Sequence, residues 1–267
     1  MPYAKNALDG TRIYFEVDGG SGAPVVLHGF LDSVTSVRGS DLAQALRDKF
    51  PLMYVDHRGL GRSDKPHDPD AYAMSLRAAD AVAVIDELDI ERAHFIGMSW
   101  GGRLGFGIGE HAPERVLSLV IGGQHPYAWP DSPLTRVVSD GLIAAQMQGM
   151  EALIQAMESF WDIRFPEALR ARYLDNDPAA LHAAWTKALA EGPISKNLGE
   201  WRIRCLIFMG AEDTDFLEQA ERAAKEIPNA VFLSLAELDH IGAHMGQGIR
   251  SSRLSSARCM LTSARSR

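Results

Sequence analysis

The stretch Gly97-Met98-Ser99-Trp100-Gly101-Gly102 places a serine between glycines that lie two residues away on each side. This spacing is typical of a nucleophile elbow, a sharp turn from a strand into a helix that strains the serine backbone. A side chain at either flanking position would collide with the turn, and glycine removes that collision. The preceding residues 94–96 predict a short buried strand. The glycine-rich residues 103–110 predict a helix packed tightly on a sheet.

Short apolar runs alternate with helix-like segments along most of the chain, which is typical of a largely parallel sheet covered on both faces. We therefore predict an α/β fold with a mostly parallel central sheet. An early strand over residues 11–17 alternates apolar and polar side chains, so we expect it to be half exposed and at a sheet edge. The other predicted strands cover residues 24–27, 52–55, 94–96, 116–121, 205–209 and 231–235, with helices over 75–88 and 216–226.

The alternation stops between Gln124 and Glu200, where no strand is predicted and helix-like stretches are separated by prolines. We interpret residues 124–200 as a helical cap inserted into one core domain, which is formed by residues 1–123 and 201–267. The insertion is rich in large apolar side chains. These pack a helical layer, and some of them could also line an apolar pocket: Tyr127, Trp129, Met147, Met150, Met157, Phe160, Trp161, Phe165 and Trp185.

Composition and charge exclude several classes of protein. The chain has 267 residues, a net charge of −8 and two cysteines, which cannot form a disulfide framework. Residues 246–267 are an atypical Ser/Arg-rich tail, and the acidic remainder gives no footprint for nucleic-acid binding. Because the chain has no signal-like N-terminus and no apolar run long enough for a membrane span, we expect a cytoplasmic, soluble protein.

A serine hydroxyl is a weak nucleophile, so Ser99 needs a base and an acid that orients the base. In elbow enzymes the acid follows a late strand, and the histidine follows the next strand. The predicted strand 205–209 runs into Glu212, Asp213 and Asp215, of which we favour Asp213. The predicted strand 231–235 runs into His240, with His244 as a rival base.

An acyl-transfer reaction also develops an oxyanion, which backbone N–H groups can stabilise. The Trp100 amide, directly after Ser99, is one predicted donor. The Phe30 amide, in the loop after the strand at residues 24–27, is the other. The histidines lack metal-ligand spacing, so we predict neither a metal nor another cofactor.

Five segments in order, at suitable strand ends, resemble the α/β-hydrolase superfamily: residues 28–30, 56–63, the Ser99 elbow, 210–213 and 239–240. The resemblance spans roughly residues 10–245. It implies a nucleophilic Ser99, a base His240, an orienting acid Asp213, and an oxyanion hole formed by the amides of Phe30 and Trp100. It also implies a structural role for the turn at residues 56–63 and a helical cap at 124–200. The serine- and arginine-rich tail departs from the terminal helix that is usual in this superfamily.

The predicted function is hydrolysis of small, largely apolar carboxylic esters through an acyl-enzyme, with an ester or lactone as the small-molecule partner. The alternatives are hydrolysis of C–C bonds or enol-lactones, as in aromatic degradation, perhydrolase activity, and a non-catalytic ligand receptor on the same fold. The acidic substrates of the first alternative require a cation near the pocket. Arg103 is the candidate, although we expect its side chain to face solvent. Oligomeric state is left open.

Overall fold

The computed structural model describes residues 3–21, 23–28 and 34–244. Its central sheet has eight strands in the order β1-β2-β4-β3-β5-β6-β7-β8. The first two strands are antiparallel to their neighbours, and β4, β3, β5, β6, β7 and β8 run parallel. The strands are β1 (Tyr3–Lys5), β2 (Arg12–Asp18), β3 (Val25–His28), β4 (Leu52–Val55), β5 (Ala93–Met98), β6 (Val116–Gly122), β7 (Cys205–Gly210) and β8 (Ala230–Leu235). The predicted α/β class is therefore confirmed.

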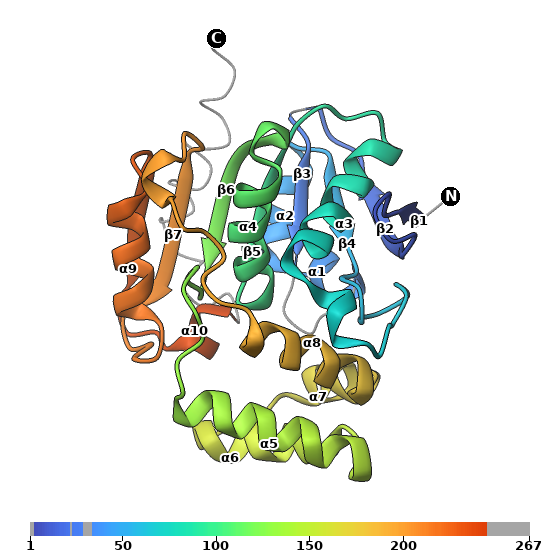
Figure 1. The fold of residues 1–267 in the computed structure, drawn as a ribbon, viewed down its shortest axis with the longest axis vertical. Helices are drawn as coiled ribbons and strands as arrows, with labels where there is room; N and C mark the ends of the chain where they lie inside the picture. The colour runs from blue at the N-terminus through green and yellow to red at the C-terminus, as the bar shows by residue number, and fades with distance from the viewer. Residues whose placement is uncertain (1–2, 22, 29–33, 245–267) are drawn as a thin grey trace.

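Helices cover both faces of this sheet (Figure 1). One face packs against α3 (Met74–Glu87), α4 (Trp100–His111) and α9 (Leu217–Glu226), and the other against α1 (Val34–Arg38) and α2 (Asp41–Arg47). The glycines of α4 let it approach its neighbours closely. For example, a Cβ on Gly105 would lie 3.0 Å from Ile121 in β6. A short helix, α10 (His240–His244), follows β8.

The early strand differs from the prediction. β2 is not at the edge, because residues 3–5 form β1 and pair with it on the outer side. Ile13, Tyr14 and Phe15 are all buried, so the alternation in the sequence does not translate into one exposed face. The hydroxyl of Tyr14 reaches the carboxylate of Glu16 at 2.6 Å, which is how this aromatic residue is buried beside polar neighbours.

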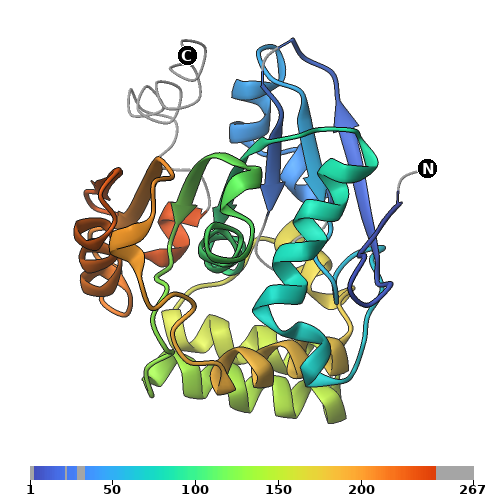
Figure 2. The same cartoon turned by 45° about the horizontal axis from the view of Figure 1, so that its top comes forward.

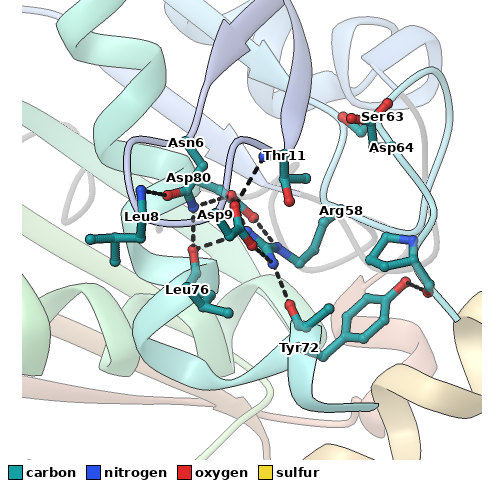
Figure 3. Close-up of polar contacts among 12 residues, drawn as sticks. Asn6, Leu8, Asp9, Thr11, Arg58, Ser63, Asp64, Tyr72, Leu76 and Asp80 are labelled. Atoms are coloured by element: carbon teal, nitrogen blue, oxygen red, sulfur yellow. Dashed lines mark hydrogen bonds and ion pairs between the residues drawn. The ribbon is translucent and has the colours of Figure 1, made fainter. Parts of the chain in front are cut away.

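The turn after β4 connects several parts of the core through one buried arginine. Arg58 donates hydrogen bonds to both carboxylate oxygens of Asp80 at 2.6 Å, and Asp80 also accepts one from Asn6. Nη1 of Arg58 also donates to Oδ2 of Asp9 at 2.8 Å. Figure 3 shows that these residues converge from the β1–β2 hairpin, the turn and α3. The turn therefore has a structural role, because Arg58 joins the β1–β2 hairpin to α3.

Residues between β6 and β7 form a helical layer across one end of the sheet (Figures 1 and 2). It contains α5 (Pro133–Gln148), α6 (Glu151–Trp161), α7 (Glu167–Leu174) and α8 (Pro178–Ala190). Short 3-10 helices lie at Pro69–Tyr72, Pro113–Arg115 and Leu198–Glu200. The layer has an apolar cluster of its own, which reaches the core through Leu60, Tyr72 and Trp100.

Candidate active site

Ser99 lies at the junction of β5 and α4 with a backbone conformation of φ 52° and ψ −112°. A positive φ is uncommon for a residue with a side chain and marks local strain. Close backbone approaches surround the turn: a Cβ on Gly97 would lie 2.2 Å from the Gly101 oxygen, and one on Gly102 would lie 2.5 Å from the Gly122 oxygen. Glycine is therefore required by space at positions 97 and 102, and the turn presents the serine at the carboxyl edge of the sheet.

The structure brings Ser99, His240 and Asp213 together from three strand ends. The Oγ of Ser99 is 3.0 Å from Nε2 of His240, and Nδ1 of His240 is 2.7 Å from Oδ2 of Asp213. All three residues are buried, and the ring of Phe216 packs edge-on against His240. An imidazole held at both nitrogens in this way can accept a proton from the hydroxyl while the carboxylate fixes its tautomer.

The rival residues are placed differently. Asp215 makes no hydrogen bond to His240, and Glu212 makes none either, within the described residues. Burial, and then the neighbouring Asp213, raise the pKa of the Asp215 carboxyl. The side chain of His244, the rival base, lies outside the part of the structure that is described.

The two predicted oxyanion donors have different outcomes. Trp100 is the first residue of α4, and no described group accepts a hydrogen bond from its backbone N–H. An unpaired N–H at the start of a helix is a natural donor to a developing negative charge. Phe30 lies outside the described residues.

A pocket opens on Ser99 and His240, with a volume of about 680 Å³ that includes space open to solvent. Its polar side chains are those of Ser99, His240 and Gln124, and the indole N–H of Trp129 has no partner among the described residues. The rest of the lining is aliphatic, thioether or aromatic: Trp100, Trp129, Leu134, Val138, Leu142, Leu153, Met157, Trp161, Leu181, Ala184, Trp185 and Phe216. Much of this lining belongs to the helical layer, so the layer and the sheet edge enclose the pocket together.

Arg103 corrects one expectation from the sequence. Its side chain does not face solvent, because the residue is 0% exposed. Its Nη1 donates to the carbonyl oxygens of His125 and Tyr127 at 3.1 and 3.0 Å, and its guanidinium carbon lies 5.0 Å from the ring centre of Trp129. Arg103 therefore holds the segment that carries Trp129 without lining the pocket itself. Burial accounts for a lowered pKa of this guanidinium.

A second buried arginine repeats this arrangement at Trp100. The guanidinium carbon of Arg77 lies 4.3 Å from the centre of the Trp100 ring, and Trp100 stacks on Trp185. Arg77 is also absent from the pocket lining. Both cations stand behind aromatic walls, so the described lining presents no arginine or lysine to a ligand.

Sequence reasoning missed Gln124 as a site residue and treated it only as the first residue of the insertion. The side chain is 1% exposed and lines the pocket with Ser99 and His240. The signal was available in its position: Gln124 follows a predicted parallel strand, and ligands bind at the carboxyl ends of such strands.

The described residues offer neither a metal site nor a helical membrane span. They contain no group of three or more His, Cys, Asp or Glu side chains arranged to hold a metal ion. None of their helices is long and apolar enough to cross a membrane.

Known proteins resemble this chain over most of its length. The family model of the alpha/beta hydrolase fold matches residues 25–202. A protein of Caulobacter vibrioides named "Putative carbamate hydrolase RutD" is 30% identical over 239 residues, which are 84% of this chain and 87% of that protein.

Solved structures share the fold at lower sequence identity. The enol-lactonase of Burkholderia xenovorans superposes with a TM-score of 0.80 at 23% identity, covering 98% of this chain and 100% of the other. The esterase RhEst1 of Rhodococcus reaches a TM-score of 0.81 at 23% identity, covering 99% and 100%. The family match and the Caulobacter relative agree with the eight-stranded sheet. The chain therefore belongs to the α/β-hydrolase fold family and is a hydrolase.

Proposed function

We propose that the protein is a serine hydrolase that cleaves small, uncharged carboxylic esters. The observation that carries this proposal is the chain of contacts from Ser99 Oγ through His240 to Asp213, at 3.0 and 2.7 Å, at the end of an apolar pocket. A hydroxyl, an imidazole and a carboxylate that contact one another in this order activate the hydroxyl for attack on a carbonyl carbon.

In the proposed mechanism, Nε2 of His240 takes the proton from Ser99 as Oγ attacks the ester carbonyl. Asp213 accepts the hydrogen bond from Nδ1 and stabilises the imidazolium that forms. The Trp100 N–H, and by resemblance the Phe30 N–H, donate to the oxyanion. The leaving alcohol takes the proton from His240, and a water activated by the same nitrogen then hydrolyses the acyl-enzyme.

The nature of the pocket supports a neutral substrate over an acidic one. Arg103 and Arg77 stand behind Trp129 and Trp100, and the described lining offers an anion only neutral donors. Transfer of a carboxylate into such a site without a partner is strongly unfavourable. This favours an ester over the dienoic acids and acidic enol-lactones of the alternative hypothesis.

The helical layer at residues 124–200 is proposed to cap the pocket and to set its shape. A carbamate is a second acyl class for the same chemistry, favoured by the name of the Caulobacter relative. It differs from an ester only in the nitrogen attached to the carbonyl carbon, so the same nucleophile and base would serve.

Labelling with a fluorophosphonate, together with p-nitrophenyl butyrate hydrolysis, tests the proposal. We expect the wild-type protein to be labelled and active, and Ser99→Ala to lose labelling and about 10³-fold or more of kcat. Ser234→Ala, at an exposed position in β8, is the matched control and should behave as wild type. Retained hydrolysis in Ser99→Ala, or no wild-type hydrolysis across short esters and carbamates, would overturn the proposal.

A further inference from the structure

Gln124 stands at the carboxyl end of β6, two residues past Gly122. Its neighbour Gly123, with φ 62°, sits so close to the base that a Cβ there would lie 3.2 Å from Cε1 of His240. The Gln124 side chain is 1% exposed and lines the same pocket as Ser99 and His240. The Cβ of Gln124 lies close to Gly102 in α4, so its side chain enters the pocket from the sheet edge that also carries Ser99 and His240.

Only one half of this amide is used within the protein. Oε1 accepts a hydrogen bond from the backbone N–H of His125 at 3.0 Å, which fixes which end of the amide is oxygen. Nε2 donates to no described residue. Nε2 is not fully buried, because it keeps accessible surface where the side chain lines the pocket, so a bound ligand can reach it. Because the rest of the lining is largely apolar, a ligand that fills the pocket has to supply the acceptor.

We propose that Gln124 is a specificity-determining residue that donates a hydrogen bond from Nε2 to a second oxygen of the substrate, close to the reacting carbonyl. The preferred substrates are then neutral esters with an ether, keto or similar oxygen on the acyl or alcohol group. A neutral donor without a neighbouring cation in the described lining suits such an acceptor better than a carboxylate. The inference rests on the proposed ester hydrolysis and refines its substrate class.

The competing explanation is that Gln124 serves only to accept the His125 N–H. Two substitutions separate the roles. Gln124→Glu keeps an oxygen for the His125 N–H but has no N–H donor, whereas Gln124→Met removes both functions at similar length. Leu134→Met alters an apolar part of the lining and is the matched control.

The experiment compares esters in which one CH₂ is replaced by an ether oxygen. The acyl pair is p-nitrophenyl butyrate and p-nitrophenyl methoxyacetate; the alcohol pair is butyl acetate and 2-methoxyethyl acetate. Each kcat/KM is divided by the rate of the same ester with hydroxide, which removes intrinsic reactivity. We expect the wild type to favour the ether ester about 3- to 10-fold in at least one pair, the effect of one neutral hydrogen bond. Both Gln124 variants should lose this ratio, and Leu134→Met should keep it.

A wild-type ratio near one in both pairs, or a ratio that persists in Gln124→Glu, overturns the inference while ester hydrolysis itself stands. If the wild type hydrolyses none of the four esters, the proposed function falls and the inference falls with it. Gln124→Met carries no charge, so loss of the ratio in both variants assigns it to the missing N–H donor and not to the negative charge in Gln124→Glu. If neither variant folds, a wild-type ratio near one in both pairs still overturns the inference.

Discussion

The Ser99 site and the Arg58 cluster both bury a carboxylate against a nitrogen-containing side chain, but the two side chains differ in what they can pass on to a third residue. Asp80 faces a guanidinium that keeps its proton; it accepts hydrogen bonds from Arg58 and Asn6, and Arg58 also donates to Asp9 (Figure 3). Asp213 faces the imidazole of His240, whose other ring nitrogen lies 3.0 Å from Ser99 Oγ. The difference shows that the partner of a buried acid, rather than the acid itself, distinguishes an anchor of the fold from the candidate active site.

The largest expected effect separates Asp213 from its neighbour. Asp213→Asn should lower kcat for p-nitrophenyl butyrate about 10³- to 10⁴-fold, because the amide no longer accepts from Nδ1 and favours the wrong tautomer of His240. Asp215→Asn should lower kcat by less than about tenfold, since Asp215 makes no hydrogen bond to His240 and its loss costs no catalytic contact. Circular dichroism checks that both variants fold. A greater loss in Asp215→Asn would reassign the acid.

Arg58→Met should have the opposite signature, with a large loss of stability and little loss of chemistry. The substitution leaves Asp80 buried without its partner, which costs about 3–5 kcal/mol in the free energy of unfolding. Urea unfolding measures this loss, and kcat per folded molecule should stay within about twofold of wild type because the cluster makes no contact with Ser99. In the double variant Arg58→Met/Asp80→Leu, removal of the stranded charge should recover part of the stability. A stability change below 1 kcal/mol in the single variant would contradict the anchor assignment.

His94 adds a pH dependence that involves neither cluster. It is fully buried with Nδ1 2.7 Å from Ser118 Oγ, and burial lowers its pKa from the ordinary 6.5 to about 4. Between pH 4 and pH 6.5 the unfolded chain therefore protonates His94 more readily than the folded protein does. Stability is full above pH 6.5 and falls as the pH drops toward 4, by about 2 kcal/mol at pH 5 from this residue.

Urea unfolding at pH 7.5 and pH 5 measures that fall, and His94→Gln should reduce it by a similar amount. His111→Gln, at an exposed position, serves as the control and should keep the wild-type difference. If His94→Gln loses as much stability on acidification as the wild type, the buried imidazole is not the source of the pH dependence.

The smallest effect is expected for Arg103→Met. Unlike Arg58, Arg103 forms no ion pair with a described residue. Two carbonyl oxygens lose a donor, but the cost of a desolvated charge also disappears, so stability should change by less than about 1 kcal/mol. KM should rise a fewfold with kcat nearly unchanged, since the Trp129 wall loses its support. A loss as large as that of Arg58→Met would remove the distinction between the two buried arginines.

Regular elements were predictable where one local pattern dominates. The strand at residues 52–55 has its predicted bounds, and β5, β6, β7 and β8 differ from theirs by a residue or two. β1 was missed because three residues carry too little periodicity, and its pairing then displaced β2 from the edge. The helix over residues 217–226 was predictable, since Pro228 limits it and its apolar residues recur at helical spacing.

The candidate site was predictable where position along the chain carries the information. Ser99, Asp213 and His240 follow strands whose ends meet at one edge of a parallel sheet, so strand order alone brings them together. The burial of Arg103 could not be predicted, because its partners are backbone carbonyls that any sequence supplies. The unused half of Gln124 depends on the absence of an acceptor around it, which only packing determines. Phe30 and residues 246–267 lie outside the described residues, so those expectations stay predictions.

The distance along the chain between the partners in the candidate site also has a consequence during synthesis. His240 lies 141 residues after Ser99 and 27 after Asp213, and it enters from beyond the last strand of the sheet. Under the proposed function, a nascent chain that has folded its elbow has a nucleophile without its base until nearly all of the described residues have left the ribosome. Hydrolytic activity would switch on only with completion of the sheet, so a prematurely terminated chain would be inert rather than a hydrolase with an open, unselective site.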